Sequence, residues 1–366
     1  MSGSSGTTSP DGDPTGSDLG EMAVVASSVP APLVTVIMPV HNGAAFIDEA
    51  IASIRTQTLP DWELLVIDDG SSDDSAARVQ RHAAQDARIC LIQQPKQGVA
   101  HALNRGMDEA RAPWIARMDC DDVSLPTRLE RTLQALQADS DLAAVGAWAT
   151  LIGARGRAVG ERHSGPTTPE AFVVQRERGP LQLISSTVIV SRELARALGG
   201  HRQEYAPAED ADFFTRIADE HRLLVLPEVL LLYRIHSRSA STQGFALQME
   251  QTRRIAANMR RRRAGQPELT RDAFRSLERQ APWRQRTARS LQARSRGYYR
   301  HGAALLADSR PSGVAWGLLS ALCFPAEPWK RLRRVRLWQT LRGQRSQHTS
   351  LVANGGPRPT LDQAAE

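Results

Sequence analysis

Clusters of carboxylate residues directly follow two strand-like segments of the sequence. The segment 68–73 (Asp-Asp-Gly-Ser-Ser-Asp) follows 62–67, and the segment 119–122 (Asp-Cys-Asp-Asp) follows 114–118. Carboxylates gathered in one crevice repel each other and raise one another's proton affinity, which a bound cation relieves. Hard oxygen ligands suit Mg²⁺ or Mn²⁺, which commonly bind one or two carboxylates together with the phosphates of a substrate. The pattern therefore indicates a crevice for a nucleotide and a metal ion.

Two further groups of polar residues lie later in the chain. The segment 209–212 (Glu-Asp-Ala-Asp) opens a predicted helix, and Arg234 and His236 follow a strand-like segment. A carboxylate of the first group can act as a general base that takes the proton from an attacking hydroxyl. Each pattern also has an ordinary structural explanation, because acidic residues are favoured at helix N-termini and Asp-Asp-Gly-Ser is common in turns. No strand-like segment is followed by a phosphate-binding loop of the type G-x-x-x-x-G-K-S/T or G-x-G-x-x-G.

The elements that must position these residues alternate between strands and helices. Apolar runs predict strands at 33–38, 62–67, 89–92, 114–118 and 142–149. Apolar residues at helical spacing predict helices at 44–58, 73–84, 98–110 and 126–138. We expect Pro39 to end the first strand. The alternation predicts an α/β fold with a parallel, doubly wound sheet, in which functional residues lie at the carboxyl ends of the strands.

The pattern changes after about residue 150. Gly and Pro residues predict loops through 153–169, and the following segment predicts strands at 185–190, 222–226 and 229–235 and helices at 191–198 and 209–219. From 243 onward the chain is rich in Arg and Gln, and we expect it to be mostly helical. We therefore expect four parts, namely a disordered leader at 1–31, a catalytic or binding domain at 32–242, a helical basic extension at 243–345 and a disordered tail at 346–366.

The composition of the 366 residues narrows the class of protein. Three scattered cysteines exclude a disulfide framework and fit a reducing cytoplasm. The sequence shows neither a secretory leader nor an apolar run near the roughly 20 residues of a membrane-spanning helix. The net charge of +6 combines −10 in residues 1–242 with +16 in residues 243–366. This asymmetry predicts a catalytic or binding body followed by a segment that is attracted to polyanions.

The ordered set of motifs resembles the inverting, nucleotide-sugar-dependent glycosyltransferases of family 2, which have the GT-A fold. The resemblance extends from about 34 to 236 and rests on the segments 36–42, 65–73, 98–106, 115–122, 125–129, 198–200, 209–212 and 227–236. It implies a Rossmann-like, mixed and mainly parallel sheet flanked by helices, with a C-terminal helical basic extension. It also implies a hexosyltransferase-type enzyme that depends on Mg²⁺ or Mn²⁺.

The resemblance implies a role for each matching residue. Asp210 is the expected catalytic base. Asp121, Asp119 and His236 are the expected metal ligands, with Asp119 and Asp121 forming the Asp-x-Asp pair. The residues expected to bind the nucleotide-sugar donor are Pro39, His41, Asn42, Asp68, Asp69, Gly98, Asn104, Arg105, Asp119, Glu209 and Arg234. Of these, Arg234 is expected to close over the diphosphate together with His236.

The implied reaction is transfer of a sugar from a nucleoside diphosphate sugar to a hydroxyl of a glycan or lipid-linked saccharide, with inversion, in cell-surface polysaccharide biosynthesis. Uridine is the expected nucleoside of the donor. Three departures from the family pattern bear on specificity. Ser185 stands where the family often has His, and Lys96-Gln-Gly98 stands where it often has Asn-x-Gly. The Gln-x-x-Arg-Trp signature of processive synthases is absent, which favours transfer of single sugars.

Two other classes of function remain open from the residues alone. A nucleotidyltransferase on a similar sheet would usually have a glycine-rich basic loop after the first strand, where this chain has Pro39-Val-His-Asn-Gly43. A non-catalytic protein that binds membranes or nucleic acid would use the basic C-terminal region instead. We expect no nucleic-acid partner, because the Arg260–Arg263 run lacks interleaved aromatic residues and is interpreted as a solvated helix face.

The region 312–338 combines a short apolar segment with clustered arginines and aromatic residues. Such a combination is typical of interfacial membrane helices. The alternative is a helical appendage that packs on the catalytic domain with a solvated basic face. Our hypothesis is a cytoplasmic enzyme that attaches peripherally, through 312–338, to the anionic inner face of the plasma membrane, where a lipid-linked acceptor would lie.

Overall fold

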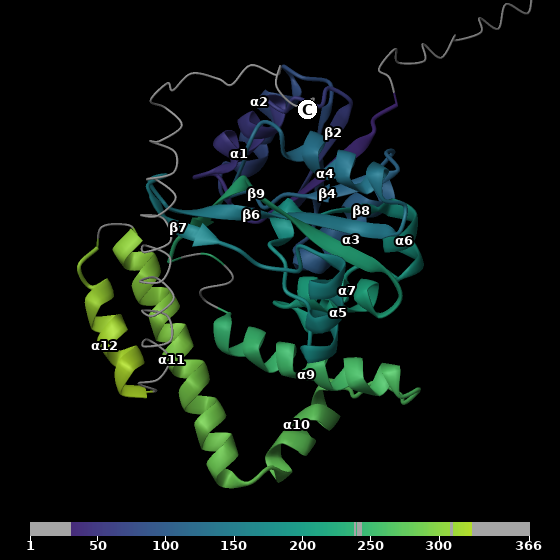
Figure 1. The fold of residues 1–366 in the computed structure, drawn as a ribbon. Coiled ribbons are helices and arrows are strands. Elements are labelled where there is room, and N and C mark those ends of the chain that lie inside the picture. Colours follow the sequence, from purple (N-terminus) through teal and green to yellow (C-terminus); the bar gives the residue numbers. More distant parts are fainter. Residues whose placement is uncertain (1–30, 238, 240–243, 308–309, 324–366) are drawn as a thin grey trace, which may run out of the picture. The chain divides into compact units, whose positions relative to one another are not determined.

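In the computed structural model, residues 31–237, 239, 244–307 and 310–323 are described (Figure 1). The predicted leader 1–31, apart from Ala31, lies outside the described residues. So do the predicted tail 346–366 and the part of 312–338 that follows residue 323.

The first half of the sheet is parallel and follows the predicted strands closely. Its strands lie in the order β3-β2-β1-β4, with bounds Ile89–Gln94, Trp62–Asp69, Val34–Val40 and Trp114–Arg117. Pro39 lies inside β1 and does not end it, contrary to our prediction. Pairing of β1 with β4 stops at Ile37, so the missing amide hydrogen of Pro39 removes no hydrogen bond on that side.

The second half of the sheet makes it mixed, as the family resemblance implied. The order continues from β4 through β8 (Ile189–Ser191), β6 (Leu142–Gly153) and β9 (Arg222–Ile235) to β5 (Val123–Ser124). Strand β8 is antiparallel to both of its neighbours, whereas β6 and β9 are parallel to each other. The two strands predicted at 222–226 and 229–235 are the single strand β9.

Two local predictions in this half are wrong, and one element was missed. The segment 153–169 is not all loop, because β7 (Ala158–Arg162) pairs antiparallel with β6. The helix α5 (Pro169–Arg178) was not predicted, although Thr168 accepts the Ala171 amide as an N-cap and Pro169 occupies the first helical position. The predicted strand at 185–190 begins with the 3-10 turn η1 (Ser185–Thr187).

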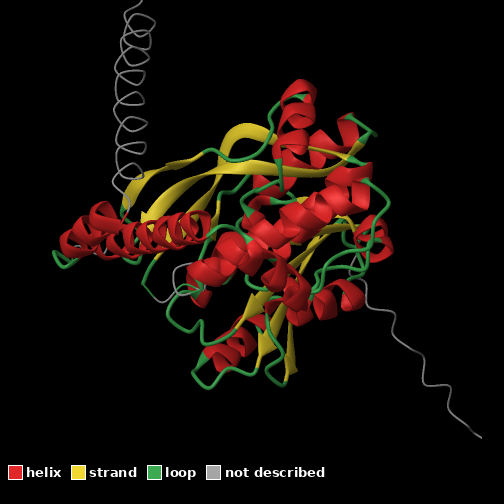
Figure 2. Cartoon of the chain, turned by 90° about the horizontal axis from the view of Figure 1, so that it is seen from below, coloured by secondary structure: helices red, strands yellow, loops and turns green. Residues whose placement is uncertain are grey.

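Helices cover both faces of the sheet, as Figure 2 shows. They are α1 (Ile47–Arg55), α2 (Ser75–Ala83), α3 (Val99–Glu109), α4 (Arg128–Ala138), α6 (Arg192–Ala197) and α7 (Glu209–Glu220), with a 3-10 turn η2 (Gln203–Tyr205) before α7. The side chains of each strand alternate between two cores. In β2, Leu64 and Val66 pack with α1 and α4, whereas Leu65 and Ile67 pack with α3 and α7. Burial on both faces explains why these strands are almost continuously apolar.

In the part of the chain that the structure describes, four helices follow the sheet. They are α9 (Phe245–Arg263), α10 (Arg271–Gln280), α11 (Trp283–Ala307) and α12 (Gly313–Cys323). Helix α12 packs tightly on α11, because a Cβ added to Gly302 would lie 2.7 Å from the Gly313 carbonyl oxygen. The Ser295 hydroxyl donates to the Ser320 carbonyl oxygen at 2.9 Å within this contact. None of the helices within the described residues has the length and apolar character needed to cross a bilayer.

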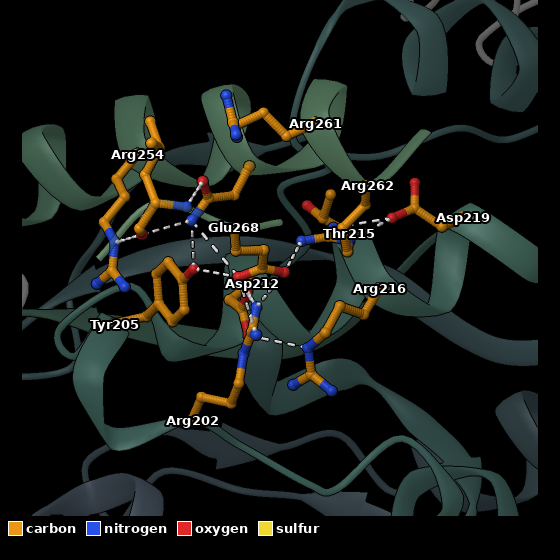
Figure 3. Close-up of polar contacts among 12 residues, drawn as sticks. Arg202, Tyr205, Asp212, Thr215, Arg216, Asp219, Arg254, Arg261, Arg262 and Glu268 are labelled. Atoms are coloured by element: carbon orange, nitrogen blue, oxygen red, sulfur yellow. Dashed lines mark hydrogen bonds and ion pairs between the residues drawn. The ribbon is translucent and has the colours of Figure 1, made fainter. Parts of the chain in front are cut away.

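A network of ion pairs joins α9 to α7 (Figure 3). Asp212 of α7 is completely buried and accepts from Arg202 at 2.9 Å and from Arg216 at 3.0 Å. Arg202 also pairs with Glu268 at 3.0 Å, and Glu268 accepts from Arg262 of α9 at 2.7 Å. Burial raises the pKa of Glu268, but the hydrogen bonds from Arg262 and Tyr205 and the charge of Arg202 bring it down to about 2.

The same network corrects the interpretation of Arg260–Arg263 as a solvated face for two of these arginines, whereas Arg260 is exposed. Arg262 and Arg263 both pair with Asp219 of α7, at 2.8 and 2.9 Å. Their side chains are only 22% and 23% exposed, so this turn of α9 is held against α7. Direct ion pairs therefore join the acidic part of the chain, residues 1–242, to the basic part that begins at residue 243.

Candidate active site

The carboxyl ends of β1, β2 and β4 lie side by side. Val40 of β1 is paired in register with Asp68 of β2, and the Met118 amide donates to a carbonyl of β1 at 3.0 Å. A Cβ atom added to Gly43 would lie 2.8 Å from the Cys120 sulfur, so the segments after β1 and β4 are in direct contact. The acidic segments after β2 and β4 therefore flank the same end of β1.

Asp69, the last residue of β2, anchors the loop that leads into α3. Its carboxylate accepts from the backbone amides of Gln97 and Gly98 at 2.7 and 2.8 Å and from the Gln94 side chain at 2.8 Å. Burial raises the pKa of Asp69, but these hydrogen bonds more than offset that effect and lower it below its ordinary value. The carboxylate is therefore held in its ionised form.

The segment after β1 is ordered by contacts with the end of β2. His41 Nδ1 donates to the Asp69 carbonyl oxygen at 3.0 Å, and Lys96 Nζ donates to His41 Nε2 at 2.9 Å. Asn42 adopts a left-handed conformation with φ of 55°, which asparagine tolerates better than most residues. Its side-chain oxygen accepts the Ser72 amide at 2.8 Å. His41 and Asn42 are exposed at this edge.

Pro39 and Asp68 lie at the same ends of β1 and β2. Pro39 is half-buried within β1. Asp68 is buried and accepts the Ser71 amide at 3.0 Å and the Gln93 side chain at 3.2 Å. The carboxylate of Asp68 thus shapes the turn after β2, as that of Asp69 shapes the loop before α3.

The three predicted residues on or before α3 have different surroundings. Gly98 has φ of 99°, and a Cβ there would lie 2.5 Å from the Gln203 side-chain nitrogen, so the position requires glycine. Asn104 exchanges two hydrogen bonds of 2.8 Å with the backbone of His201 and so clamps the segment before η2. Arg105 is exposed and forms its ion pair with Glu109 on the same helix.

Asp121 and His236 meet at the junction of β5 and β9. His236 Nε2 lies 2.9 Å from Asp121 Oδ2, and both side chains are partly exposed. Arg234 ties the two segments together, because its Nε donates to the Asp121 carbonyl oxygen at 2.7 Å and its Nη2 donates to Glu49 at 2.6 Å. The guanidinium of Arg234 is buried and lies over the Phe46 ring.

A divalent cation fits the Asp121–His236 pair as two of its ligands. Within the described part of the chain, no three His, Cys, Asp or Glu side chains are grouped closely enough to hold a metal by themselves. Mg²⁺ and Mn²⁺ commonly take one or two carboxylates and complete their shell with substrate phosphates and water. The structure therefore brings Asp121 and His236 together, whereas the third predicted ligand, Asp119, faces an arginine.

That arginine, Arg117 at the end of β4, joins the acidic segments of β4 and α7. Its Nη2 lies 3.0 Å from Asp119 Oδ1, and its Nη1 lies 3.6 Å from Glu209 Oε1. Burial and the charge of neighbouring Asp210 raise the pKa of Glu209 to about 7, although the attraction of Arg117 acts to lower it. Arg117 Nη1 and Glu209 Oε2 are buried without a hydrogen-bond partner among the described residues.

Asp210, the predicted base, follows Glu209 in the first turn of α7. The Ser185 hydroxyl of η1 donates to Asp210 Oδ2 at 2.5 Å. Asp210 Oδ1 accepts the amide of the next residue at 2.7 Å. Asp210 is half-buried, so its carboxylate is held in place and still has access to solvent.

Buried Asp122 and Cys120 complete the segment after β4. Asp122 accepts the Arg234 amide at 2.8 Å and is 1% exposed. Burial raises the pKa of Asp122 well above its ordinary value, and the charges of Asp121 and Asp119 raise it further. Burial and the same three aspartates also raise the pKa of the Cys120 thiol. Asp122 is therefore a structural carboxyl that fixes β9 against this segment.

Sequence reasoning missed Arg117 and the function of Ser185 as the partner of Asp210. A signal existed for Arg117, because a residue that precedes three aspartates by two positions is well placed to balance their charge. Ser185 was noted as a departure from the family pattern, but nothing in the sequence pairs it with Asp210, which lies 25 residues later.

The chain matches known proteins in both sequence and fold. The family model described as Glycosyl transferase family 2 matches residues 35–190. The O-antigen biosynthesis glycosyltransferase WbnJ of Escherichia coli is 31% identical over 222 residues, which cover 58% of this chain and 84% of WbnJ. A glycosyltransferase of Haemophilus influenzae is 27% identical over 229 residues, which cover 58% of this chain and 68% of the relative.

Among solved structures, the mannosyltransferase PcManGT from Pyrobaculum calidifontis, in complex with GDP-Man and Mn²⁺, is 20% identical with a TM-score of 0.51. The match covers 85% of this chain and 84% of PcManGT and shows a common fold. The mixed sheet flanked by helices is thus the predicted GT-A fold. Because the chain matches this family model and also covers 84% of WbnJ at 31% identity, it belongs to glycosyltransferase family 2.

Proposed function

We propose that this protein transfers a single hexosyl-type sugar from a nucleoside diphosphate sugar to a hydroxyl of a glycan or lipid-linked saccharide, with inversion of the anomeric configuration. The proposed setting is the biosynthesis of cell-surface polysaccharide. The relative WbnJ is named for O-antigen biosynthesis, which supports this setting.

The observation that carries the proposal is the linkage of Asp119 and Glu209 through Arg117. This arginine joins the segment that contains Asp121 to the segment that contains Asp210. Two polar atoms at this junction, Arg117 Nη1 and Glu209 Oε2, are buried without a partner among the described residues. Because buried polar groups are nearly always hydrogen-bonded, these two atoms fit a site whose bound substrate supplies the missing partners.

In this proposal Asp210 is the catalytic base. Its carboxylate, oriented by the Ser185 hydroxyl, takes the proton from the acceptor hydroxyl. The acceptor oxygen then attacks the anomeric carbon from the face opposite the nucleoside diphosphate, and the bond from that carbon to the diphosphate oxygen breaks. One displacement inverts the configuration, unlike the two displacements of a retaining glycosidase with its pair of carboxyl groups.

Asp121 and His236 would hold the divalent cation, with the remaining ligands coming from the diphosphate and water. When bound, Mg²⁺ or Mn²⁺ acts as a Lewis acid that stabilises the negative charge on the departing diphosphate. Arg234 is a positioning residue in this scheme, because its guanidinium contacts the Asp121 backbone and Glu49. This role replaces the predicted contact of Arg234 with the diphosphate.

The donor side of the site would be formed by the ends of β1 and β2 and the loop before α3. Asp69 holds the amides of Gln97 and Gly98, and exposed His41 and Asn42 border the same edge. PcManGT is described in complex with GDP-Man and Mn²⁺, which supports a nucleotide-sugar donor and a divalent ion. We keep uridine as the proposed nucleoside of the donor, with guanosine as the alternative that the test must include.

The test is a panel of UDP-, GDP- and dTDP-sugars screened by thermal unfolding of the full chain, with Mn²⁺ or with EDTA. A ligand present at 100 times its Kd stabilises the folded state by about 2.7 kcal/mol. We expect Mn²⁺-dependent stabilisation by one nucleotide class, followed by release of the matching nucleoside diphosphate when acceptor glycans are added. Stabilisation by no nucleotide sugar in either condition would refute the proposal.

Peripheral attachment to a membrane is a separate part of the proposal. Helix α12 contains no charged residue and exposes Val314, Leu318, Leu319 and Leu322, the last of them 80% exposed. Exposed aliphatic side chains next to a basic segment fit the surface of an anionic bilayer. The test compares sedimentation of the full chain and of Leu318→Ser/Leu322→Ser with phosphatidylglycerol vesicles. Equal sedimentation of both would remove this part of the proposal and leave the catalytic part untouched.

A further inference from the structure

A groove of about 500 Å³ lies between α9, α10 and α11 and shares no residue with the candidate active site. Five arginines line it, namely Arg253, Arg275, Arg279, Arg286 and Arg289. They come from three different helices, so the groove exists only in the folded extension. Neither the family resemblance nor the proposed reaction assigns any role to it.

The groove carries more positive charge than its own carboxylates balance. Two glutamates line it, Glu250 and Glu278. Glu278 pairs with Arg253 at 2.8 Å and with Arg289 at 3.3 Å, and Glu250 pairs with Arg275 at 2.9 Å. Five guanidinium groups against two carboxylates leave three positive charges around one hollow. Like charges held together are unfavourable, and a multivalent anion would relieve their repulsion.

Arg279 and Arg286 carry two of these three charges. Both are exposed, and neither lies within ion-pair distance of an acidic side chain in the part of the chain that the structure describes. Arg279 donates to the Ser276 hydroxyl at 3.1 Å, and Arg286 donates to the Arg279 carbonyl oxygen at 3.5 Å. The Arg286 side chain therefore lies against the backbone of Arg279 across the turn between α10 and α11.

Guanidinium groups in this arrangement match one class of ligand. Each presents a planar fork of N–H donors that binds two oxygens of a phosphate group at once, and several around a hollow suit a diphosphate. We propose that the groove between α9, α10 and α11 is a binding site for a phosphate or diphosphate group, distinct from the nucleotide-sugar site. Such a group belongs either to a soluble phosphorylated compound or to the headgroup of an anionic lipid.

The proposal can be tested by titrating the full chain with inorganic pyrophosphate in EDTA, using calorimetry. EDTA removes divalent ions and so weakens competing binding at Asp121 and His236. We expect the double variant Arg279→Gln/Arg286→Gln to raise the Kd by at least about tenfold, because each substitution removes charge-assisted hydrogen bonds. The matched control, Arg294→Gln, changes an exposed arginine of α11 that does not line the groove and should leave the Kd unchanged.

The Asp121→Asn variant separates this proposal from the proposed function. If pyrophosphate binding is lost in Asp121→Asn and retained in the double arginine variant, the phosphate site is the nucleotide-sugar site and the inference is wrong. The opposite result supports the groove, whatever the outcome of the nucleotide-sugar screen.

Vesicles distinguish the two sources of the phosphate. The full chain, the double variant and the Arg294→Gln control are sedimented with phosphatidylglycerol vesicles and with phosphatidylcholine vesicles. If only the double variant fails to sediment, and only with the phosphatidylglycerol vesicles, the ligand of the groove is a lipid headgroup. Pyrophosphate binding without such a loss assigns it to a soluble ligand. Equal pyrophosphate affinity and equal sedimentation of all three proteins would overturn the inference.

Discussion

The Ser185 hydroxyl donates to Asp210 Oδ2 at 2.5 Å and so links the turn before β8 to the first turn of α7. We expect Ser185→Ala to lower kcat by about tenfold or more, because a hydrogen bond to a charged group contributes about 1.5–3 kcal/mol. The KM for the donor should change little, because Ser185 contacts the catalytic base Asp210 and is not among the residues proposed to bind the donor. Steady-state kinetics with the identified donor measure both constants.

Rescue distinguishes this positioning role from a general effect on folding. Ser185→Thr retains the hydroxyl and should recover most of the lost kcat, whereas Ser185→Ala should melt within a few degrees of the parent protein. If Thr and Ala at this position have the same kcat, the hydrogen bond does not orient the base.

Asp210→Asn tests the base itself. The amide keeps the size of the side chain but cannot take up the acceptor proton, so we expect kcat to fall by about 10²–10⁴-fold. Donor binding, measured by calorimetry with Mn²⁺, should stay near that of the parent protein. The Asp74→Asn variant, which changes an exposed carboxylate at the start of α2, is the matched control. Transfer at the parental rate would exclude Asp210 as the base.

Asp121→Asn and His236→Gln test the metal pair. Because the two side chains lie 2.9 Å apart and supply the proposed protein ligands, each substitution should weaken Mn²⁺ binding by at least about tenfold. Binding is measured by titrating Mn²⁺ into protein saturated with the nucleoside diphosphate. Asp119→Asn should have a smaller effect on Mn²⁺ affinity, because its carboxylate pairs with Arg117. If all three variants lose Mn²⁺ affinity equally, Asp119 is also a ligand of the metal.

Because His201 is buried, we expect the folding stability to depend on pH. Burial, together with the charges of Arg117 and Arg216, lowers the pKa of His201 to about 3. In the unfolded chain the pKa is about 6.5, so below that pH the unfolded state binds a proton that the folded state does not. The free energy of unfolding should therefore fall as the pH decreases from about 6.5, by about 2 kcal/mol at pH 5.

Comparison with His201→Gln isolates this effect from other titrating groups. The variant should lose less stability than the parent between pH 7.5 and pH 5, as measured by urea unfolding at both values. Glu209, with a pKa near 7, acts in the opposite direction but is common to both proteins. Parallel stability curves for the two proteins would show that His201 does not remain neutral when folded.

Asp212→Asn tests the network that joins α7 to α9. Asp212 is completely buried between Arg202 and Arg216, and loss of its charge leaves these guanidinium groups without their buried partner. Breaking a buried ion pair costs about 3–5 kcal/mol, which corresponds to about 6 °C or more in Tm. The control is Asp272→Asn, an exposed carboxylate in the first turn of α10, which should change Tm by about 2 °C at most.

Much of the catalytic body could be predicted from local patterns. The strands β1 to β4 and the helices between them follow the alternation of apolar runs and helical spacing, and the ends of parallel strands necessarily meet at one edge. The gathering of the segments after β1, β2 and β4 followed from that topology. The strand β8 was predicted in part, but its antiparallel direction was not. The strands β5 and β7 were not predicted, because β5 has two residues and pairs with β9 far along the chain, and β7 lies in a segment whose Gly and Pro residues predict loops.

The sequence by itself determined the class of this protein, since its ordered motifs identify the family and the strands that carry them. Only the tertiary structure decided which side chains meet. It paired Asp210 with Ser185 and Glu209 with Arg117, turned Arg234 inward, and closed five arginines of three helices around one groove. The physical reason is that burial and ion pairing depend on contacts between residues far apart in the chain, which local patterns of residue type do not encode.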